Sequence, residues 1–208
     1  MSFEQWLALT MASAVLLAIP GPTVLLVVSY ALSHGRRAAL ATVAGVALGD
    51  FTAMTASLLG LGALLATSSE LFTALRLIGA AYLIYLGIGL WRAPVGGAVA
   101  AEPNARGRSG IFLHAYAVTA LNPKSIVFFV AFLPQFLSDS APILPQFLLC
   151  EVTFLVLATL NATAYALLAS GARRIIRKPT VQRCVNWVGG GLLIGAGILT
   201  ATWRAAKT

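Results

Sequence analysis

Charged side chains are scarce in this sequence. Only 10% of its 208 residues are charged, and the six acidic residues are outnumbered by fourteen Lys and Arg. Soluble domains carry charge on about a quarter of their residues. Here 59% of the residues are hydrophobic and the mean hydropathy is +0.90. The composition excludes an ordinary soluble domain and predicts an all-α integral membrane protein in a lipid bilayer.

Cysteine and histidine are also rare, with two of each. Cys150 and Cys184 fall near opposite membrane faces in the predicted topology, which disfavours both a disulfide and a paired redox site. His34 and His114 are isolated, and no HExxH or CxxC motif occurs. The segment ALGD at 47–50 lacks the first glycine and the second intramembrane aspartate of an aspartyl intramembrane protease. We therefore expect no enzyme, no cofactor and no resident metal.

The formal net charge of +8 does not indicate nucleic-acid binding, because the basic residues lie between apolar segments and no basic patch carries interleaved aromatics. About 20 residues are needed for each membrane span. No separate cleavable segment precedes the first apolar stretch, so we expect that stretch to remain in the protein. The apolar pattern predicts six helices, at 3–32, 38–66, 70–91, 111–134, 142–171 and 181–203.

The basic residues predict the orientation in the membrane. The second and fourth connections carry only Glu70 and Asp139, whereas the other three connections are basic. The positive-inside rule then places both termini on the outer, periplasmic side, although Arg204 and Lys207 weakly oppose this. The basic residues of the first, third and fifth connections are Arg36, Arg37, Arg92, Arg106, Arg108, Arg173, Arg174, Arg177, Lys178 and Arg183.

The chain divides into two halves that align with each other. An offset of 101 residues places Pro22 on Pro123 and Asp50 on Glu151. Three spans in each half give the halves opposite orientations, so the alignment favours an inverted repeat with a binding site between the halves. Chance similarity of apolar, glycine-rich segments is the alternative. We predict one transporter domain over 1–208, made of repeats 1–92 and 111–208 joined by a cytoplasmic linker, 93–110.

The first span is interrupted at Pro20, Gly21 and Pro22. Proline removes a backbone donor, and an unsatisfied backbone group in lipid costs several kcal/mol. Broken backbone is tolerated at membrane depth only inside protein or beside a watery cavity. The interruption therefore predicts a transport path at these residues.

A second interruption lies in the fourth span, at Asn122 and Pro123, with Lys124 directly after it. Asn is a good helix cap and Pro suits the first turn, so a new helix is predicted to begin there. Its amides and Lys124 would bind a substrate carboxylate. Alternatively, Lys124 snorkels or serves as a permanent structural strut.

Two carboxylates lie within predicted spans. An ionised Asp50 near mid-helix costs roughly 2.5 to 3.5 kcal/mol, so it needs a partner or a protonation role. It would attract a substrate ammonium group or carry a proton, unless it is a neutral acid that fixes helix packing. Glu151 lies nearer the outer end of its span, where a packing or headgroup role is the alternative. Asn161 is interpreted more simply, as a residue that makes a hydrogen bond between helices.

Four segments in this order resemble the LysE/RhtB family of bacterial amino-acid exporters: IPGPTVLLVVSYALSHGRRAAL, GVALGD, LRLIGAAYLIYLGIGLWR and LNPKSIVFFVAFLPQFL. The resemblance covers nearly the whole chain. It implies a proton-driven exporter of homoserine, threonine or similar amino acids in the bacterial cytoplasmic membrane. Thr23 stands where many members have asparagine, and Glu151 rests on the repeat alignment alone. The family pattern transfers to Pro20, Gly21, Pro22, Gly49, Asp50, Asn122, Pro123 and Lys124.

The expected mechanism is alternating access, with one half of the protein rocking against the other around a central site. The expected partners are the amino acid, protons, the bilayer and, as a possibility, further copies of the chain. A transporter of metal or other small ions is the first alternative. A membrane enzyme acting on lipid phosphate is the second, because Lys124 and the arginines would also suit phosphate.

Overall fold

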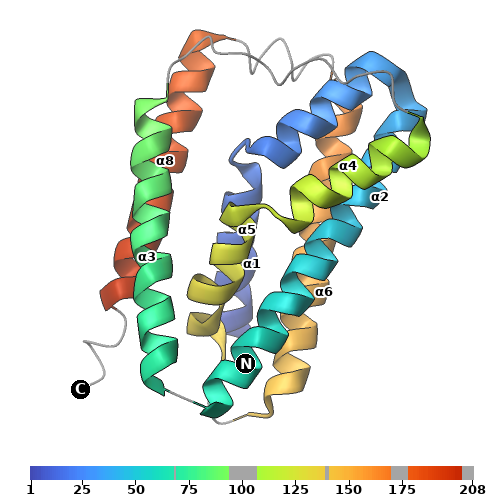
Figure 1. The fold of residues 1–208 in the computed structure, drawn as a ribbon. Helices are drawn as coiled ribbons and strands as arrows, with labels where there is room; N and C mark the ends of the chain where they lie inside the picture. The colour runs from blue at the N-terminus through green and yellow to red at the C-terminus, as the bar shows by residue number, and fades with distance from the viewer. Residues whose placement is uncertain (68, 94–106, 139–140, 170–177, 203–208) are drawn as a thin grey trace.

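The computed structural model describes residues 1–67, 69–93, 107–138, 141–169 and 178–202, and all elements within these ranges are helical (Figure 1). Most of the predicted linker 93–110 lies outside them, as do Arg106, Asp139, Arg173, Arg174, Arg177, Arg204 and Lys207. The helices are α1 (Phe3–Ala18), α2 (Pro22–Thr67), α3 (Ser69–Arg92), α4 (Arg108–Ala120), α5 (Pro123–Val127), η1 (Phe128–Phe132), η2 (Leu133–Phe136), α6 (Ile143–Leu167) and α8 (Pro179–Thr202).

Among the described residues, four helical segments are long and apolar enough to cross a membrane. A fifth is obtained if α1 and the first part of α2, which are bent by 55°, count as one broken span. In α3 the apolar part is the shorter Leu77–Arg92. The membrane character is thus confirmed, whereas six spans in an inverted repeat remain a prediction. The four segments are Ala38–Gly62, Arg108–Phe136, Ile143–Leu167 and Pro179–Thr202.

The first break lies where the sequence predicts it. α1 ends at Ala18, and its C-cap Ile19 is extended at φ −72° and ψ 114°. Pro22 opens α2, where its missing N–H is no loss. A second bend, inside α2, falls at Gly35 with φ 71° and ψ −166°, a backbone conformation that favours glycine. The second part of the first predicted span and the whole second predicted span therefore form one helical run bent at Gly35.

The second break is also confirmed. α4 ends before Leu121, and the side chain of Asn122 caps α5 by accepting a hydrogen bond from the backbone N–H of Lys124 at 3.1 Å. α5 then continues into the π-helical turn η1 and the 3₁₀ turn η2. π-Helices occur mostly as single turns, and such turns are frequent at functional sites.

Glycines allow two helix pairs to pack closely. A Cβ atom at Gly45 would lie 2.5 Å from the Phe112 carbonyl oxygen, so α2 and α4 touch there through their backbones. At Gly197 a Cβ atom would lie 2.7 Å from the Ala80 carbonyl oxygen, which joins α8 to α3. In lipid there is no hydrophobic driving force between helices, so they associate largely through van der Waals packing. Small residues at such crossings allow this packing because they let the helix backbones approach closely.

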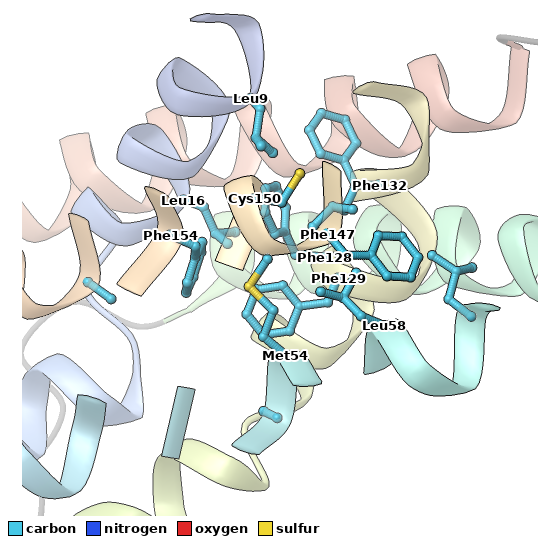
Figure 2. Packing of buried hydrophobic residues seen from close by; sticks show 14 of the residues in the cluster. Leu9, Leu16, Met54, Leu58, Phe128, Phe129, Phe132, Phe147, Cys150 and Phe154 are labelled. Carbon is cyan, nitrogen blue, oxygen red and sulfur yellow. The ribbon is translucent and has the colours of Figure 1, made fainter. Parts of the chain in front are cut away.

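The largest apolar cluster joins α1, α2, η1 and α6, and Figure 2 shows its labelled side chains converging from these elements. Phe129 and Phe154 meet edge to face, with ring centroids 4.8 Å apart. A second cluster, around Val27, Val46 and Ala162, is built mainly from smaller residues. Residues of both clusters line the central cavity described below, so apolar packing bounds that cavity on two sides.

Gly49→Ala is expected to destabilise the protein although alanine favours helices. A Cβ at Gly49 would lie 2.8 Å from the Tyr116 carbonyl oxygen, so α2 and α4 would have to separate. Overpacking of this kind costs about 1–3 kcal/mol. Gly60→Ala is the matched control in the same helix, because no atom lies within 4 Å of its Cβ position. Thermal unfolding in detergent should show a lower Tm for Gly49→Ala alone; equal Tm values would contradict the close contact.

Candidate functional site

The two breaks meet at a small buried cavity. The described residues around it include oppositely charged Asp50 and Lys124, which lie on α2 and α5, far apart in sequence. The cavity measures about 30 Å³, counted as space open to the centres of water molecules. It is lined by Leu16, Leu17, Gly21, Thr23, Val24, Val27, Val46, Asp50, Asn122, Lys124, Ser125, Ala158, Asn161 and Ala162.

The end of α1 explains how the first break is tolerated. The last four carbonyls of a helix have no partner within it, and here Pro20 and Pro22 also lack the N–H groups that a continuing helix would supply. Side chains from α5 and α6 take their place. Lys124 Nζ donates to the carbonyl oxygens of Leu16 and Ile19, both at 3.1 Å.

The remaining two carbonyls are satisfied from α6. Asn161 Nδ2 donates to the Leu17 carbonyl oxygen at 3.2 Å, and the Tyr165 hydroxyl donates to that of Ala18 at 3.3 Å. Asn161 and Tyr165 are four residues apart, so they lie on one face of α6. Every carbonyl from Leu16 to Ile19 thus accepts a side-chain hydrogen bond. We call these four groups the α1 carbonyl end.

The two breaks are also joined directly. Asn122 Nδ2 donates to the Thr23 hydroxyl at 3.4 Å, and the Thr23 hydroxyl lies 3.5 Å from that of Thr119. Asn122 caps α5 with its carbonyl oxygen and contacts α2 with its amide nitrogen. Asn122 therefore links the two breaks through its side chain.

Asp50 faces this cavity from the middle of α2 and is 3% exposed. Gly49 beside it packs against Thr119 and Tyr116, which holds this part of α2 against α4. Lys124 is close enough to Asp50 to interact with it electrostatically, yet its ammonium group donates its hydrogen bonds to the α1 carbonyl end. Asp50 and Lys124 thus line the same cavity, but the hydrogen bonds of the Lys124 ammonium go to the α1 carbonyl end.

The cavity is smaller than an amino acid. Pockets that bind small molecules typically measure about 300–1,000 Å³, so a cavity of about 30 Å³ has room for water but not for an amino acid. Binding of an amino acid requires side chains or helices around the cavity to move.

The structure brings together only some of the predicted residues. Gly21, Asp50, Asn122 and Lys124 line the cavity. Pro20, Pro22, Gly49 and Pro123 shape the adjoining backbone without lining it. Glu151 is also absent from the lining, and its carboxylate accepts a hydrogen bond from the Thr55 hydroxyl at 2.5 Å, joining α6 to α2.

Sequence reasoning misses two polar residues of the site, Tyr165 and Ser125. It identifies Thr23 only as a departure from the family pattern, although Thr23 lines the cavity. Asn161 was interpreted only as interhelical hydrogen bonding, although it also lines the cavity. The four-residue spacing of Asn161 and Tyr165 was the one available signal.

Comparison with known proteins shows the family to which the chain belongs. The LysE type translocator family matches residues 14–203. The chain is 37% identical over 210 residues to the homoserine/homoserine lactone efflux protein of Salmonella typhimurium, covering 99% of this chain and 100% of the relative. It is 33% identical over 205 residues to an uncharacterised membrane protein of Vibrio cholerae, covering 99% and 100%. No solved structure matches the chain.

The family match spans both breaks, Asp50 and Lys124. It confirms the resemblance drawn from the sequence motifs, and the efflux relatives agree with a transporter rather than an enzyme. With apolar helices long enough to cross a bilayer, this chain belongs to the LysE type translocator family of membrane transporters.

Proposed function

We propose that this protein exports a small zwitterionic amino acid across the cytoplasmic membrane. The observation that carries the proposal is the presence of Asp50 and Lys124 in one buried cavity between two helix breaks. Transporters with broken helices bind substrate at such breaks near the membrane midplane. Relatives named as homoserine/homoserine lactone efflux proteins support a substrate of this size and direction of transport.

The lining favours an amino acid with a small, neutral, polar side chain. Besides the charged pair, the polar groups around the cavity are the hydroxyls of Thr23 and Ser125 and the amides of Asn122 and Asn161. The other lining residues are apolar or glycine, and Asp50 is the only acid among them. A second cation on a substrate such as lysine would lack a carboxylate of its own, and burying an unpaired charge is costly.

Proton coupling through Asp50 is part of the proposal. A buried carboxylate that gains and loses a proton during the cycle would exchange inward proton flow for outward substrate flow. Alternating access would come from rocking of the predicted inverted halves, 1–92 and 111–208, about the breaks. Glu151 is the acid that the repeat pairs with Asp50, and its contact with Thr55 makes it a candidate for a second protonation step nearer the outer face.

Export measured with purified protein in lipid vesicles tests the proposal. A panel of amino acids should show uptake driven by an imposed pH gradient, with homoserine or threonine favoured over lysine. The same vesicles should be tested with divalent and monovalent metal ions and with lipid phosphates. Transport of a metal ion alone would replace the proposal with the first alternative, and phosphate release from lipid would replace it with the second. The molecular mass of the purified protein would show whether several copies of the chain assemble.

Thiol labelling tests the proposed orientation, with both termini outside. Glu70→Cys and Gly107→Cys place single exposed thiols at opposite ends of the helices, once Cys150 and Cys184 are replaced by serine. Because basic connections stay in the cytoplasm, an impermeant reagent should label position 70 in intact cells. Position 107 should react only after permeabilisation. Reversed labelling would place both termini inside.

A further inference from the structure

The α1 carbonyl end already holds an ammonium group. The Lys124 ammonium donates to the Leu16 and Ile19 carbonyl oxygens at 3.1 Å each, while Asn161 and Tyr165 hold the two carbonyls between them. A helix C-terminus carries partial negative charge, and free carbonyls there attract cations. Hydrogen-bonding carbonyls also favour a cation with N–H donors over one without. The geometry is thus that of a site for a primary ammonium group.

Lys124 is placed to leave this site. Its partners are neutral carbonyls, so its departure separates no ion pair, and its flexible four-carbon stem turns easily. Lys124 also lines the cavity, so its displaced ammonium group would stay beside a substrate bound there. Gly21 leaves space for this movement of the Lys124 side chain, because a Cβ atom at position 21 would be in van der Waals contact with Lys124 Nζ, at 3.4 Å.

We propose that the α1 carbonyl end is the binding site for the substrate's ammonium group, and that Lys124 occupies it between transport events. This inference rests on the proposed function and deepens it. The incoming ammonium displaces Lys124 from the Leu16 and Ile19 carbonyls, and the freed Lys124 pairs with the substrate carboxylate. The substrate ammonium group thereby takes the carbonyl partners of Lys124, and the substrate carboxylate becomes the new partner of Lys124. Asp50 is then left free to carry the proton.

The proposal separates two roles that the sequence left open for Asp50. If backbone carbonyls bind the ammonium group, Asp50 does not have to bind it. The recognised chemistry is then a cation with at least two N–H donors, because two carbonyls accept from Lys124. A quaternary ammonium carries the same charge and has no such donors.

Rescue of a lysine-less variant tests the site directly. Lys124→Ala, purified in detergent, exposes the Leu16 and Ile19 carbonyls. Methylammonium chloride should raise the Tm of this variant in a concentration-dependent manner, whereas tetramethylammonium chloride at the same ionic strength should not. Wild-type protein should show no such difference, because Lys124 fills the site. The measurement is made in detergent because amines collapse pH gradients across vesicles.

Lys178→Ala is the matched control, since Lys178 is an exposed lysine outside the cavity. Equal Tm values for Lys124→Ala in the two salts would overturn the proposal. A difference of the same size in Lys178→Ala would overturn it as well, because the effect would then not come from the carbonyl end.

Competition in the wild-type protein keeps the proposal testable if Lys124→Ala does not fold. The exported amino acid is compared with its N-methyl and N,N,N-trimethyl derivatives as inhibitors of export. Inhibition by the N-methyl form and its loss in the trimethyl form support the carbonyl site, and equal inhibition by both overturns it. Failure of the proposed function looks different, since the wild-type protein would then export no amino acid while methylammonium rescue of Lys124→Ala persisted.

Discussion

Asp50→Asn is expected to abolish proton-driven export while exchange of internal for external substrate continues. The amide is nearly the same size as the acid, so the packing of α2 against its neighbours should be kept. It cannot take up and release a proton at any working pH, so the pH gradient loses its connection to the transport cycle. Substrate exchange at equal pH needs no such connection. Both rates would be measured with labelled amino acid in vesicles.

Glu70→Gln is the matched control, an acid-to-amide change at the exposed start of α3. It should leave both rates unchanged. Loss of exchange as well as driven export in Asp50→Asn would mean that Asp50 binds the substrate ammonium. If Glu151→Gln loses proton-driven export while Asp50→Asn keeps it, Glu151 and not Asp50 is the residue that carries the proton. A strongly reduced yield of folded Asp50→Asn would favour a packing role.

The two helix breaks could be predicted from the sequence because their causes are local. Proline lacks an N–H and clashes with the preceding turn, whatever surrounds it. The structure accordingly ends α1 before Pro20 and opens α5 at Pro123, with Asn122 as its cap. Asp50 and Lys124 could be selected for the same kind of reason, since a charge within an apolar span needs an explanation wherever it lies.

The capping of the α1 carbonyl end could not be predicted, because it depends on how α1, α5 and α6 pack. Nothing in the sequence tells which side chains reach carbonyls more than a hundred residues away, as those of Lys124 and Tyr165 do. The absence of N–H groups at Pro20 and Pro22 did indicate that outside donors were needed. Their identity required the fold.

Glu151 illustrates the limit of the repeat alignment. The alignment equates it with Asp50, but a match in sequence does not decide which neighbours a residue meets in the fold. In the structure Glu151 bonds to Thr55 and does not line the cavity. The π-helical turn Phe128–Phe132 was equally beyond prediction, because its apolar sequence fits an α-helix just as well.

Lys124→Gln is expected to impair both stability and export. The glutamine NH2 group also has two N–H donors, but it is one bond closer to the backbone than the lysine ammonium, so we expect it not to reach both carbonyls. A buried polar group left unsatisfied costs about 1–3 kcal/mol. Loss of the positive charge also removes the partner of the substrate carboxylate. A hydrogen bond to a charged group contributes about 1.5–3 kcal/mol, so substrate affinity should fall roughly 10- to 100-fold. Thermal unfolding in detergent and concentration-dependent export in vesicles measure the two effects.

The two effects can be separated by restoring stability alone. Gly60→Ala adds a helix-favouring residue at a position with no neighbour within 4 Å, so combining it with Lys124→Gln should recover up to about 1 kcal/mol. A permanent strut predicts that export recovers as the Tm rises. A lysine that takes part in each transport event predicts that export stays low although the Tm rises, because the positive charge at position 124 is still absent. Lys178→Gln, at an exposed lysine, should change neither quantity.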